Sequence, residues 1–496
     1  MKEGYIPKKD RKTILFLADD LRLPSGIGTM TRELVLNNAH HYNFVHVGGA
    51  VNHPEVGKIQ DLSHSVNEEM GLTDASVLIY PYSGYGDPDL VRMLIERHNV
   101  DAIVHFTDPR YWIWLYRMSA EIRQRVPIFY YHIWDDLPAP HYNRPYYESC
   151  DLLMGISKQS VNISRLVLGK NGYIDLDAST PKELVSKPIP KVCYVPHGIN
   201  HELFKPLDRS DKAVQEMRAK LFNGADPEFV LFYNNRNIRR KMTSDAILAF
   251  KLFHDKLPKE KQAGVRFVLH TQSVDENGTD LPAVIDAVCP ELANKILITD
   301  VRLNPQDMNV LYNCCDTVIN IASNEGWGLS STEALMTGRT LINNVTGGLQ
   351  DQCRFEDENG NWIDFNEDFG SNHAGIYKKH GKWVKPVYPA GINLQGSVPT
   401  PYIFDDRADV RDVANAIRYW YNMSSEERNV CGLTGREWAT SKEAGFTADS
   451  MASSFRTSMD QVMESWVQPK RFNMYNVEDQ VNKFKNKKSG ISLSYE

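Results

Sequence analysis

Two glutamates eight positions apart, Glu325 and Glu333, bracket a glycine-rich turn in the stretch "NEGWGLSSTEALMTG". The turn consists of Gly326, Trp327, Gly328 and Leu329. Carboxylates accept hydrogen bonds from paired hydroxyls, as on a ribose or a hexose, and glycine lets backbone amides approach a ligand closely. We therefore predict a ligand site here. The alternative is that one glutamate offsets charge at a helix N-terminus while the other lies on a solvated face.

Four cations in "NNRNIRRKM" form a second candidate site. They are Arg236, Arg239, Arg240 and Lys241, and they follow an apolar run typical of a strand. A phosphate-bearing ligand suits such a cluster, because each charge-assisted hydrogen bond contributes about 1.5–3 kcal/mol. A solvated loop with charges beside a helix would have the same composition, so this motif alone leaves both interpretations open.

A third candidate is the stretch "LRLPSGIGTMTREL", which contains Gly26 and Gly28. It follows the first apolar run and opens a predicted helix, whose free N–H groups could bind an anion. The spacing is not that of GxGxxG. An ordinary strand-to-helix turn capped by Ser25 is the alternative interpretation.

The elements that must position these motifs alternate between short apolar runs and amphipathic segments. This alternation predicts parallel sheets with right-handed crossovers. The alternation of strands and helices begins again near residue 228, after a turn-rich joint at 197–210. We therefore expect two doubly wound domains. In open sheets of this class, ligands bind beyond the carboxyl ends of the strands, where all three motifs fall. The predicted strands are "ILFLAD", "SVLIYPY", "DAIVHFT", "VPIFYYH", "DLLMGIS", "KVCYVPH", "EFVLFYNNR", "VRFVLHT", "KILITD", "DTVINIA" and "TLINNV".

Composition limits the classes of protein that need consideration. A chain of 496 residues is too long for one core, so two or three domains are expected. The net charge of -7 gives no general attraction to nucleic acid or anionic membrane. We find no signal peptide and no apolar run near the roughly 20 residues of a membrane span. Seven cysteines without CxxC spacing predict reduced thiols and a cytoplasmic location.

Taken together, these motifs resemble the retaining GT-B glycosyltransferases, in particular family GT4. Glu325 and Glu333 have that family's E-x7-E spacing, Arg236 and Lys241 match its spaced cations, and His132 in "FYYHIWDD" matches its N-domain histidine. "YVPHGINHELFKP" resembles its inter-domain segment, and "PSGIGTMTREL" is similar to its glycine loop. The likeness covers roughly residues 13–350 and 405–466.

The resemblance implies an α/β fold of GT-B type, in which two Rossmann-like domains face a central cleft. It implies an acceptor domain over 1–203 and a donor domain over 204–445, followed by a helix over 446–467 that crosses back to the first domain. A polar tail over 468–496 completes the chain. An aromatic and glycine-rich insertion at 351–403 departs from the family pattern; it includes a hairpin-like "HGKW" and could cover the donor or shape the acceptor site.

The family also implies a role for each matching residue. Glu325 and the amides of Gly326 to Leu329 would contact the transferred sugar, and His132 would line its site. Glu333 would hold the ribose. Arg236, Lys241 and the loop from Gly26 to Gly28 would carry the diphosphate. Retention in this family is explained by front-face attack, in which the leaving phosphate accepts the acceptor's proton.

The resemblance implies no metal, and no cofactor other than a nucleotide-sugar donor, for which a UDP-sugar is the first choice. "WDD" and "FDD" are not DxD sites, although Asp135 and Asp136 lie close to His132 and could meet the acceptor. Ser25 and the pair Arg339–Thr340 are smaller departures from the family pattern.

The acceptor is less constrained than the donor. The chain resembles phage-encoded GT-B enzymes, some of which glycosylate hydroxymethylated DNA bases, which would place it in a host cytoplasm with duplex DNA as a partner. Basic residues near both ends, including Lys8, Arg11 and the Lys483–Lys488 cluster, could touch a polyanion. A glycan, lipid-linked or small-molecule acceptor is the alternative. A sugar-nucleotide epimerase and a non-catalytic binding module are the remaining function classes. The sequence does not fix the sugar or the oligomeric state.

Overall fold

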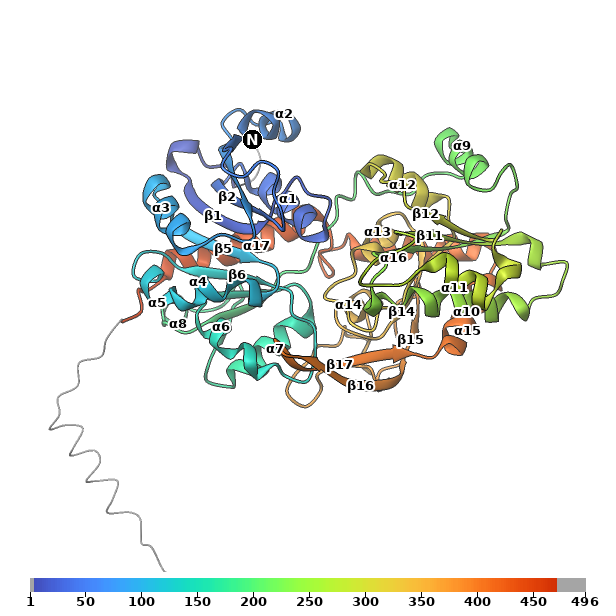
Figure 1. The fold of residues 1–496 in the computed structure, drawn as a ribbon. Helices are drawn as coiled ribbons and strands as arrows, with labels where there is room; N and C mark the ends of the chain where they lie inside the picture. The colour runs from blue at the N-terminus through green and yellow to red at the C-terminus, as the bar shows by residue number, and fades with distance from the viewer. Residues whose placement is uncertain (1–3, 471–496) are drawn as a thin grey trace, which may run out of the picture.

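The computed structural model describes residues 4–470, which form two α/β domains side by side (Figure 1). The first domain contains a nine-stranded sheet in the order β3-β4-β2-β1-β5-β6-β7-β9-β8, parallel except for the β3–β4 pair. Its strands are β1 Lys12–Asp19, β2 Tyr42–Ala50, β3 Gln60–Asp61, β4 Val77–Ser83, β5 Ala102–Phe106, β6 Ile128–His132, β7 Leu152–Gly155, β8 Ile174–Asp175 and β9 Lys191–Tyr194. Its helices are α1 Gly26–Asn38, α2 Ser63–Met70, α3 Pro88–His98, α4 Ile113–Arg117, α5 Ser119–Ile122, α6 Arg144–Glu148, α7 Lys158–Leu168 and α8 Lys182–Val185.

The second domain contains a six-stranded parallel sheet in the order β12-β11-β10-β13-β14-β15. Its strands are β10 Phe229–Asn234, β11 Val265–His270, β12 Ile296–Thr299, β13 Thr317–Asn320, β14 Thr340–Asn344 and β15 Val384–Val387. Its helices are α9 Lys212–Leu221, α10 Thr243–Asp255, α11 Leu281–Val288, α12 Pro305–Asn313, α13 Leu329–Met336, α14 Leu349–Cys353, α15 Val410–Tyr421 and α16 Ser425–Ala439. Each of the predicted strands overlaps a strand of these two sheets.

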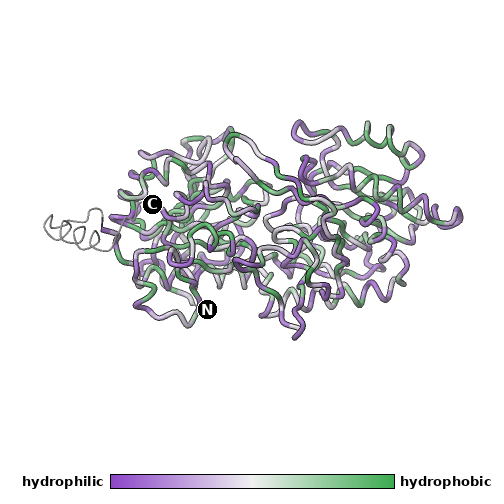
Figure 2. The backbone as a smooth tube through the Cα atoms, turned by 90° about the horizontal axis from the view of Figure 1, so that it is seen from below, coloured by the Kyte–Doolittle hydropathy of each residue, from purple (hydrophilic) through white to green (hydrophobic). Residues whose placement is uncertain are grey.

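Continuous apolar runs form the central strands because both faces of each sheet are covered. In β1, Ile14 to Ala18 are fully buried, and in β10 the same holds for Phe229 to Tyr233. Parallel strands enclosed by helices on both faces have this pattern. Seen from below, apolar chain segments run through the interior of both domains, and polar segments gather in the loops (Figure 2). The fold class predicted from the alternation is confirmed.

The chain crosses between the domains twice, and the two crossings lie side by side. The amide of Ile199 donates to the carbonyl of Phe446 at 2.9 Å, and the amide of Ala448 donates to the carbonyl of Ile199 at 3.0 Å. A Cβ atom on Gly198 would lie 2.1 Å from the carbonyl oxygen of Thr447. Only glycine allows the two strands of this hinge to approach so closely.

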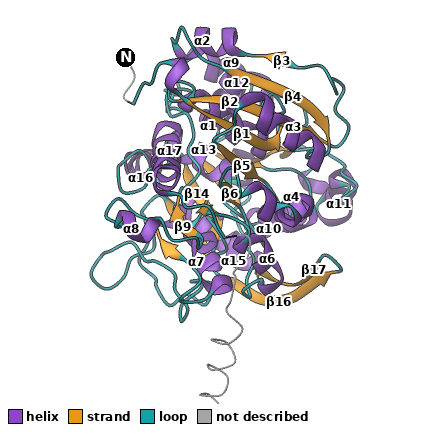
Figure 3. Ribbon diagram, turned by 90° about the vertical axis from the view of Figure 1, so that its left-hand side faces the viewer, coloured by secondary structure: helices purple, strands orange, loops and turns teal. Residues whose placement is uncertain are grey.

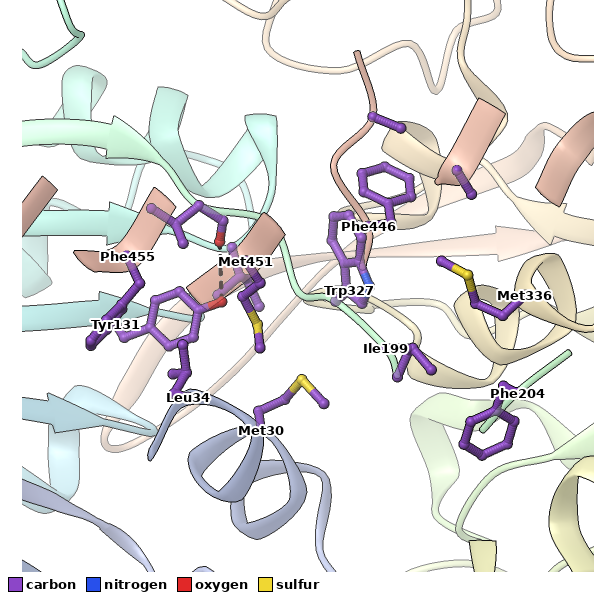
Figure 4. Close-up of a cluster of buried hydrophobic side chains, with 14 of the residues drawn as sticks. Met30, Leu34, Tyr131, Ile199, Phe204, Trp327, Met336, Phe446, Met451 and Phe455 are labelled. Atoms are coloured by element: carbon purple, nitrogen blue, oxygen red, sulfur yellow. Dashed lines mark hydrogen bonds between the residues drawn. The ribbon is translucent and has the colours of Figure 1, made fainter. Parts of the chain in front are cut away.

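Helix α17 (Ala448–Ser465) returns to the first domain and packs against α1. Met451, Phe455, Met459 and Val462 form its buried stripe. Figure 4 shows Met451 and Phe455 beside Tyr131 and the α1 side chains, while Trp327 and Phe446 continue the same apolar cluster into the hinge. The core therefore runs through the joint between the domains.

The segment 351–403 is not a single insertion. Part of it, β15, completes the second sheet beside β14, with Val384 opposite Leu341. The hairpin expected at "HGKW" lies later, where β16 Pro389–Ser397 pairs with β17 Thr400–Ala408 across the turn at Val398 and Pro399. Trp383 of "HGKW" is instead buried against Trp438, with ring centroids 4.8 Å apart. Burial of that tryptophan, which the local pattern did not indicate, holds the segment against the domain.

Candidate active site

A cavity of about 1270 Å³ lies between the two domains, at the carboxyl ends of both sheets. Its walls come from the loops after β1, β6, β10 and β13 and from the β16–β17 hairpin. Of the predicted site residues, the cavity is lined by Gly26, Asp135, Asp136, Arg236, Lys241, Glu325, Gly326, Trp327, Gly328, Leu329 and Glu333.

Lys241 and Glu325, which both line this cavity, form a buried ion pair. Lys241 ends a short 3-10 turn after β10, and Glu325 lies in the turn after β13. Burial alone would raise the pKa of Glu325, but the charges of Lys241 and Arg240 outweigh it and lower that pKa. Burial lowers the pKa of Lys241, and Glu325 opposes that shift. The pair places opposite charges where a polar ligand can compete for each.

The glycine turn has a shape that side chains would block. Gly328 has φ +89°, and a Cβ on it would lie 2.5 Å from Leu349 Cδ2. A Cβ on Gly326 would lie 3.1 Å from the carbonyl oxygen of Ile133 in the first domain. The turn leads into α13, whose first residues, Leu329 and Ser330, line the cavity. Trp327 differs from the other three turn residues, since its ring is buried against Phe446 in the hinge cluster (Figure 4).

Glu333 is held by two partners that the sequence patterns did not single out. The Tyr312 hydroxyl donates to Glu333 Oε2 at 2.5 Å, and Asn234 Nδ2 donates to the same oxygen at 3.3 Å. Burial raises the pKa of Glu333 to about 7, although both hydrogen bonds oppose this shift. The carboxylate therefore has one oxygen occupied and one available to a ligand.

The predicted cations take different positions. Arg236 is largely exposed and pairs with Asp275 at 2.8 Å. Arg240 donates to the carbonyl of Asn324 at 2.6 Å and lies 3.7 Å from Glu325 Oε2. Arg239 also borders the cavity. Asp275, in the loop after β11, orients Arg236 and was not predicted from the sequence.

The glycine loop of the first domain faces the turn of the second. Ser25 caps α1 by accepting from the Gly28 amide at 2.9 Å. A Cβ built on Gly26 would lie 3.4 Å from Leu329 Cδ1, so the two predicted donor loops nearly meet. Gly28 is not among the residues that line the cavity; a Cβ there would clash with the carbonyl of Leu23 at 2.6 Å. Its role in this structure is close packing of the turn.

The histidine that borders the cavity is His197 rather than the predicted His132. His132 is fully buried in the first domain and shares a 2.7 Å hydrogen bond with Tyr147. His197 lines the cavity and shares a 2.9 Å hydrogen bond with Tyr131. Burial lowers the pKa of each imidazole to about 3, so both are neutral. In the sequence, "PHGIN" was assigned to the joint between the domains, so His197 was not predicted as a site residue. In the structure, the joint itself borders the cavity.

Asp135 and Asp136 line the cavity from the loop after β6 in the first domain. Asn324 Nδ2 donates to Asp136 Oδ1 at 2.7 Å, which connects the two domains beside Glu325. Burial raises the pKa of both carboxyls, and the charge of Asp135 adds to the effect on Asp136. Within residues 4–470, no group of three or more His, Cys, Asp and Glu side chains could hold a metal ion.

Comparisons with known proteins place the fold. No protein-family model matches the chain, and no curated protein matches its sequence. Solved structures do match over almost the whole chain. Anabaena Alr3699/HepE, solved with UDP and glucose, superposes with a TM-score of 0.60 at 14% identity and covers 91% of this chain and 100% of its own. Sucrose-phosphate synthase from Thermosynechococcus elongatus gives 0.61 at 14%, covering 92% and 100%.

A third neighbour, α,α-trehalose 6-phosphate synthase from Burkholderia multivorans, gives a TM-score of 0.59 at 10% identity, covering 92% of this chain and 99% of its own. These likenesses establish the GT-B fold with its parallel sheets. None of the helices in the described part of the chain is long and apolar enough to cross a membrane.

Proposed function

We propose that this protein is a retaining glycosyltransferase of the GT4 type, which moves a sugar from a nucleoside-diphosphate sugar to a hydroxyl acceptor. The observation that carries the proposal is the cavity between the domains, in which the Lys241–Glu325 pair, Glu333 and the glycine turn face one space. HepE, which has the same fold, was solved with UDP and glucose. A UDP-sugar is accordingly the donor that we propose.

The donor would occupy the second domain's half of the cavity. Glu333 would accept from the ribose hydroxyls through the oxygen that Tyr312 leaves available. Arg236, Arg240 and Lys241 would meet the diphosphate, and Glu325 with the amides of the glycine turn would meet the sugar. The donor's phosphate would compete with Glu325 for Lys241, which frees Glu325 to accept from the sugar hydroxyls.

Catalysis would then follow from charge stabilisation. As the bond between the anomeric carbon and the phosphate oxygen breaks, negative charge grows on the nucleoside diphosphate. Fixed cations and amides stabilise such a transition state without having to reorganise. The acceptor oxygen would attack from the leaving group's side and pass its proton to the leaving phosphate, so that no protein base is needed and the anomeric configuration is kept.

The predicted DNA acceptor has less support from the described residues than the donor has. Arg11, one of the basic residues near the N-terminus, is buried and bonded to Asp74 at 2.6 Å, which removes it from a polyanion surface. The Lys483–Lys488 cluster lies outside the described residues. A hydroxymethylated base in DNA stays a prediction from the sequence.

A donor screen tests the proposal. The protein is incubated with UDP-, GDP- and ADP-sugars as donors. The acceptors are hydroxymethylcytosine-containing DNA and a panel of sugars, each added or left out, and mass spectrometry measures the masses of the products. Transfer or hydrolysis of one donor supports the proposal. A change of the donor's sugar without transfer would favour the epimerase, and binding without turnover would favour the non-catalytic module.

A further inference from the structure

A second, smaller cavity of about 360 Å³ adjoins the donor cavity. The two share Ile133, Asp135, Asp136, Gln395 and Ile403. One wall of the smaller cavity comes from the first domain, at Asp108, Arg110 and residues 133–136, and the other comes from the β16–β17 hairpin. Figure 3 shows this hairpin beside α6 of the first domain, although the chain enters it from the second domain's sheet.

Several hydrogen bonds fix the hairpin wall to the first domain. The Tyr142 hydroxyl donates to the carbonyl of Tyr402 at 2.9 Å, and the Tyr402 hydroxyl donates to the carbonyl of Ala139 at 3.1 Å. The amide of Phe404 donates to the carbonyl of Leu137 at 2.6 Å. The small cavity is therefore bounded by two walls that are already joined, and a ligand need not order them.

The charges around the small cavity are mostly acidic. Among the residues that line it are three carboxyl groups, those of Asp108, Asp135 and Asp136, and one cation, Arg110. Arg110 is already engaged: Nε lies 2.9 Å from Asp108 Oδ1, Nη2 also bonds Asp108, and Nη1 donates to Thr400 at 2.5 Å. A phosphate placed here would meet carboxylates and a guanidinium that is already paired.

We propose that this small cavity is the acceptor site, and that it takes an uncharged polyol of the size of one sugar ring. The inference rests on the proposed function and names the substrate class of the same reaction. Its volume lies at the small end of the roughly 300–1,000 Å³ typical of ligand pockets, which suits a single ring better than a chain. Carboxyl and amide groups of Asp135, Asp136 and Gln395 supply the hydrogen-bonding capacity that hydroxyls need.

The site also places the acceptor for transfer. A ring in the small cavity can reach the donor cavity past the shared residues Asp135, Asp136 and Gln395. Its hydroxyl oxygen forms the new bond to the anomeric carbon, the bond from that carbon to the phosphate oxygen breaks, and the electron pair leaves with the nucleoside diphosphate. The hydroxyl proton goes to that phosphate. Burial raises the pKa of Asp135 and Asp136, which favours the protonated form of these carboxyls, and a protonated carboxyl can both donate to and accept from a polyol.

Three acceptor probes test the substrate class. The full-length protein receives a saturating nucleotide sugar together with uncharged monosaccharides and polyols, the same sugars carrying a phosphate, or duplex DNA containing hydroxymethylcytosine. We expect uncharged sugars to have a kcat/KM about tenfold or more above their phosphorylated forms. Preferential transfer to a phosphorylated sugar or to DNA overturns the inference, and so does donor hydrolysis without transfer to any uncharged sugar. A chain that binds no nucleotide sugar at all overturns the proposed function, and this inference with it.

Two variants tie the result to the small cavity. Gln395→Ala, an exposed change on the hairpin, should raise the acceptor KM by about three- to tenfold, the loss expected for one hydrogen bond, and should change the donor KM less. Leu394→Ala is the matched control, because this neighbouring residue is 65% exposed and lines neither cavity. Asp108→Asn removes the carboxylate that neutralises Arg110, so that this cation can pair with a phosphate. The variant should improve the kcat/KM for a phosphorylated sugar by about fivefold. Unchanged acceptor selectivity in both Gln395→Ala and Asp108→Asn would contradict the assignment.

Discussion

The hydroxyl of Tyr312 on α12 donates a 2.5 Å hydrogen bond to Glu333 on α13, which lines the cavity between the domains. This bond fixes the carboxylate that we assign to the ribose. Tyr312→Phe should therefore raise the donor KM by about three- to tenfold, the range for one hydrogen bond, and change kcat less. Initial rates at varied donor concentration give the two constants. Tyr419→Phe, a change at a partly exposed hydroxyl on α15, should leave both unchanged; an equal effect there would show that the loss is not specific to Glu333.

The raised pKa of Glu333 predicts a pH dependence of donor binding. Its carboxyl has a pKa of about 7, so it is protonated below that pH and then accepts less well from the ribose hydroxyls. The donor Kd should rise as pH falls from about 8 to 6, approaching tenfold per unit once the carboxyl is mostly protonated. Calorimetric titration measures it. Glu333→Gln should bind weakly at every pH, and a wild-type Kd that does not change over this range would exclude the assigned role.

Much of the fold and part of the site follow from the sequence. Buried apolar runs such as "ILFLAD" predict central strands because helices cover both faces of the sheet. β2 was not predicted, since Asn43, His46, Gly48 and Gly49 interrupt its apolar run. The site motifs that the sequence predicted, such as the glycine turn with Glu325 and Glu333, each lie within one short stretch of the chain. Glu333's partners, Asn234 and Tyr312, lie 99 and 21 positions away, so only the folded chain brings them together.

The histidine prediction failed for a related reason. The motif around His132 indicates a polar residue after a strand, but not which way the side chain points. In the structure β6 directs it into the core toward Tyr147, and His197 takes the place at the cavity. Local sequence patterns could not predict the position of the β16–β17 hairpin either. That position depends on hydrogen bonds to Leu137 and Ala139, which lie more than 250 positions earlier in the chain.

The hinge offers a test by steric change. Because a Cβ on Gly198 would lie 2.1 Å from the carbonyl oxygen of Thr447, Gly198→Ala should force the two crossings apart. We expect a loss of about 1–3 kcal/mol in the free energy of unfolding, the usual cost of overpacking. Denaturant unfolding measures it. Gly391→Ala is the control, since a Cβ there meets nothing within 4 Å; equal stability of the Gly198 variant and the wild type would contradict the described hinge contact.

Asp351 predicts a pH dependence of stability. This carboxyl on α14 accepts from the amide of Lys158 and the hydroxyl of Tyr194 in the first domain, and burial raises its pKa to about 7. An unfolded aspartate has a pKa of about 3.9, so the folded state binds the extra proton between the two values. Its contribution to the free energy of unfolding is full below about pH 4 and is lost as pH rises through about 7, by at most about 1.4 kcal/mol per unit.

Asp351→Asn should remove this dependence while keeping an oxygen for Lys158 and Tyr194. Thermal unfolding at several pH values should show the variant more stable than the wild type near pH 8, and the two should converge near pH 4. Asp286→Asn, at an exposed position on α11, is the matched control and should follow the wild type. A variant whose stability ran parallel to the wild type across this range would show that Asp351 carries no shifted pKa.

The central claim is that Lys241 and Glu325 act on one nucleotide-sugar donor. The most direct measurement is the rate of nucleoside diphosphate release from the donor by the wild type, Lys241→Ala and Glu325→Ala, with Lys256→Ala and Glu358→Ala, both exposed, as controls. Because Arg240 remains 3.7 Å from Glu325, the Lys241 variant keeps a partial counter-charge and should stay folded. We predict that each cavity variant lowers turnover by about tenfold or more with unchanged circular dichroism, while the controls match the wild type. Turnover near the wild-type rate in both cavity variants would contradict the account.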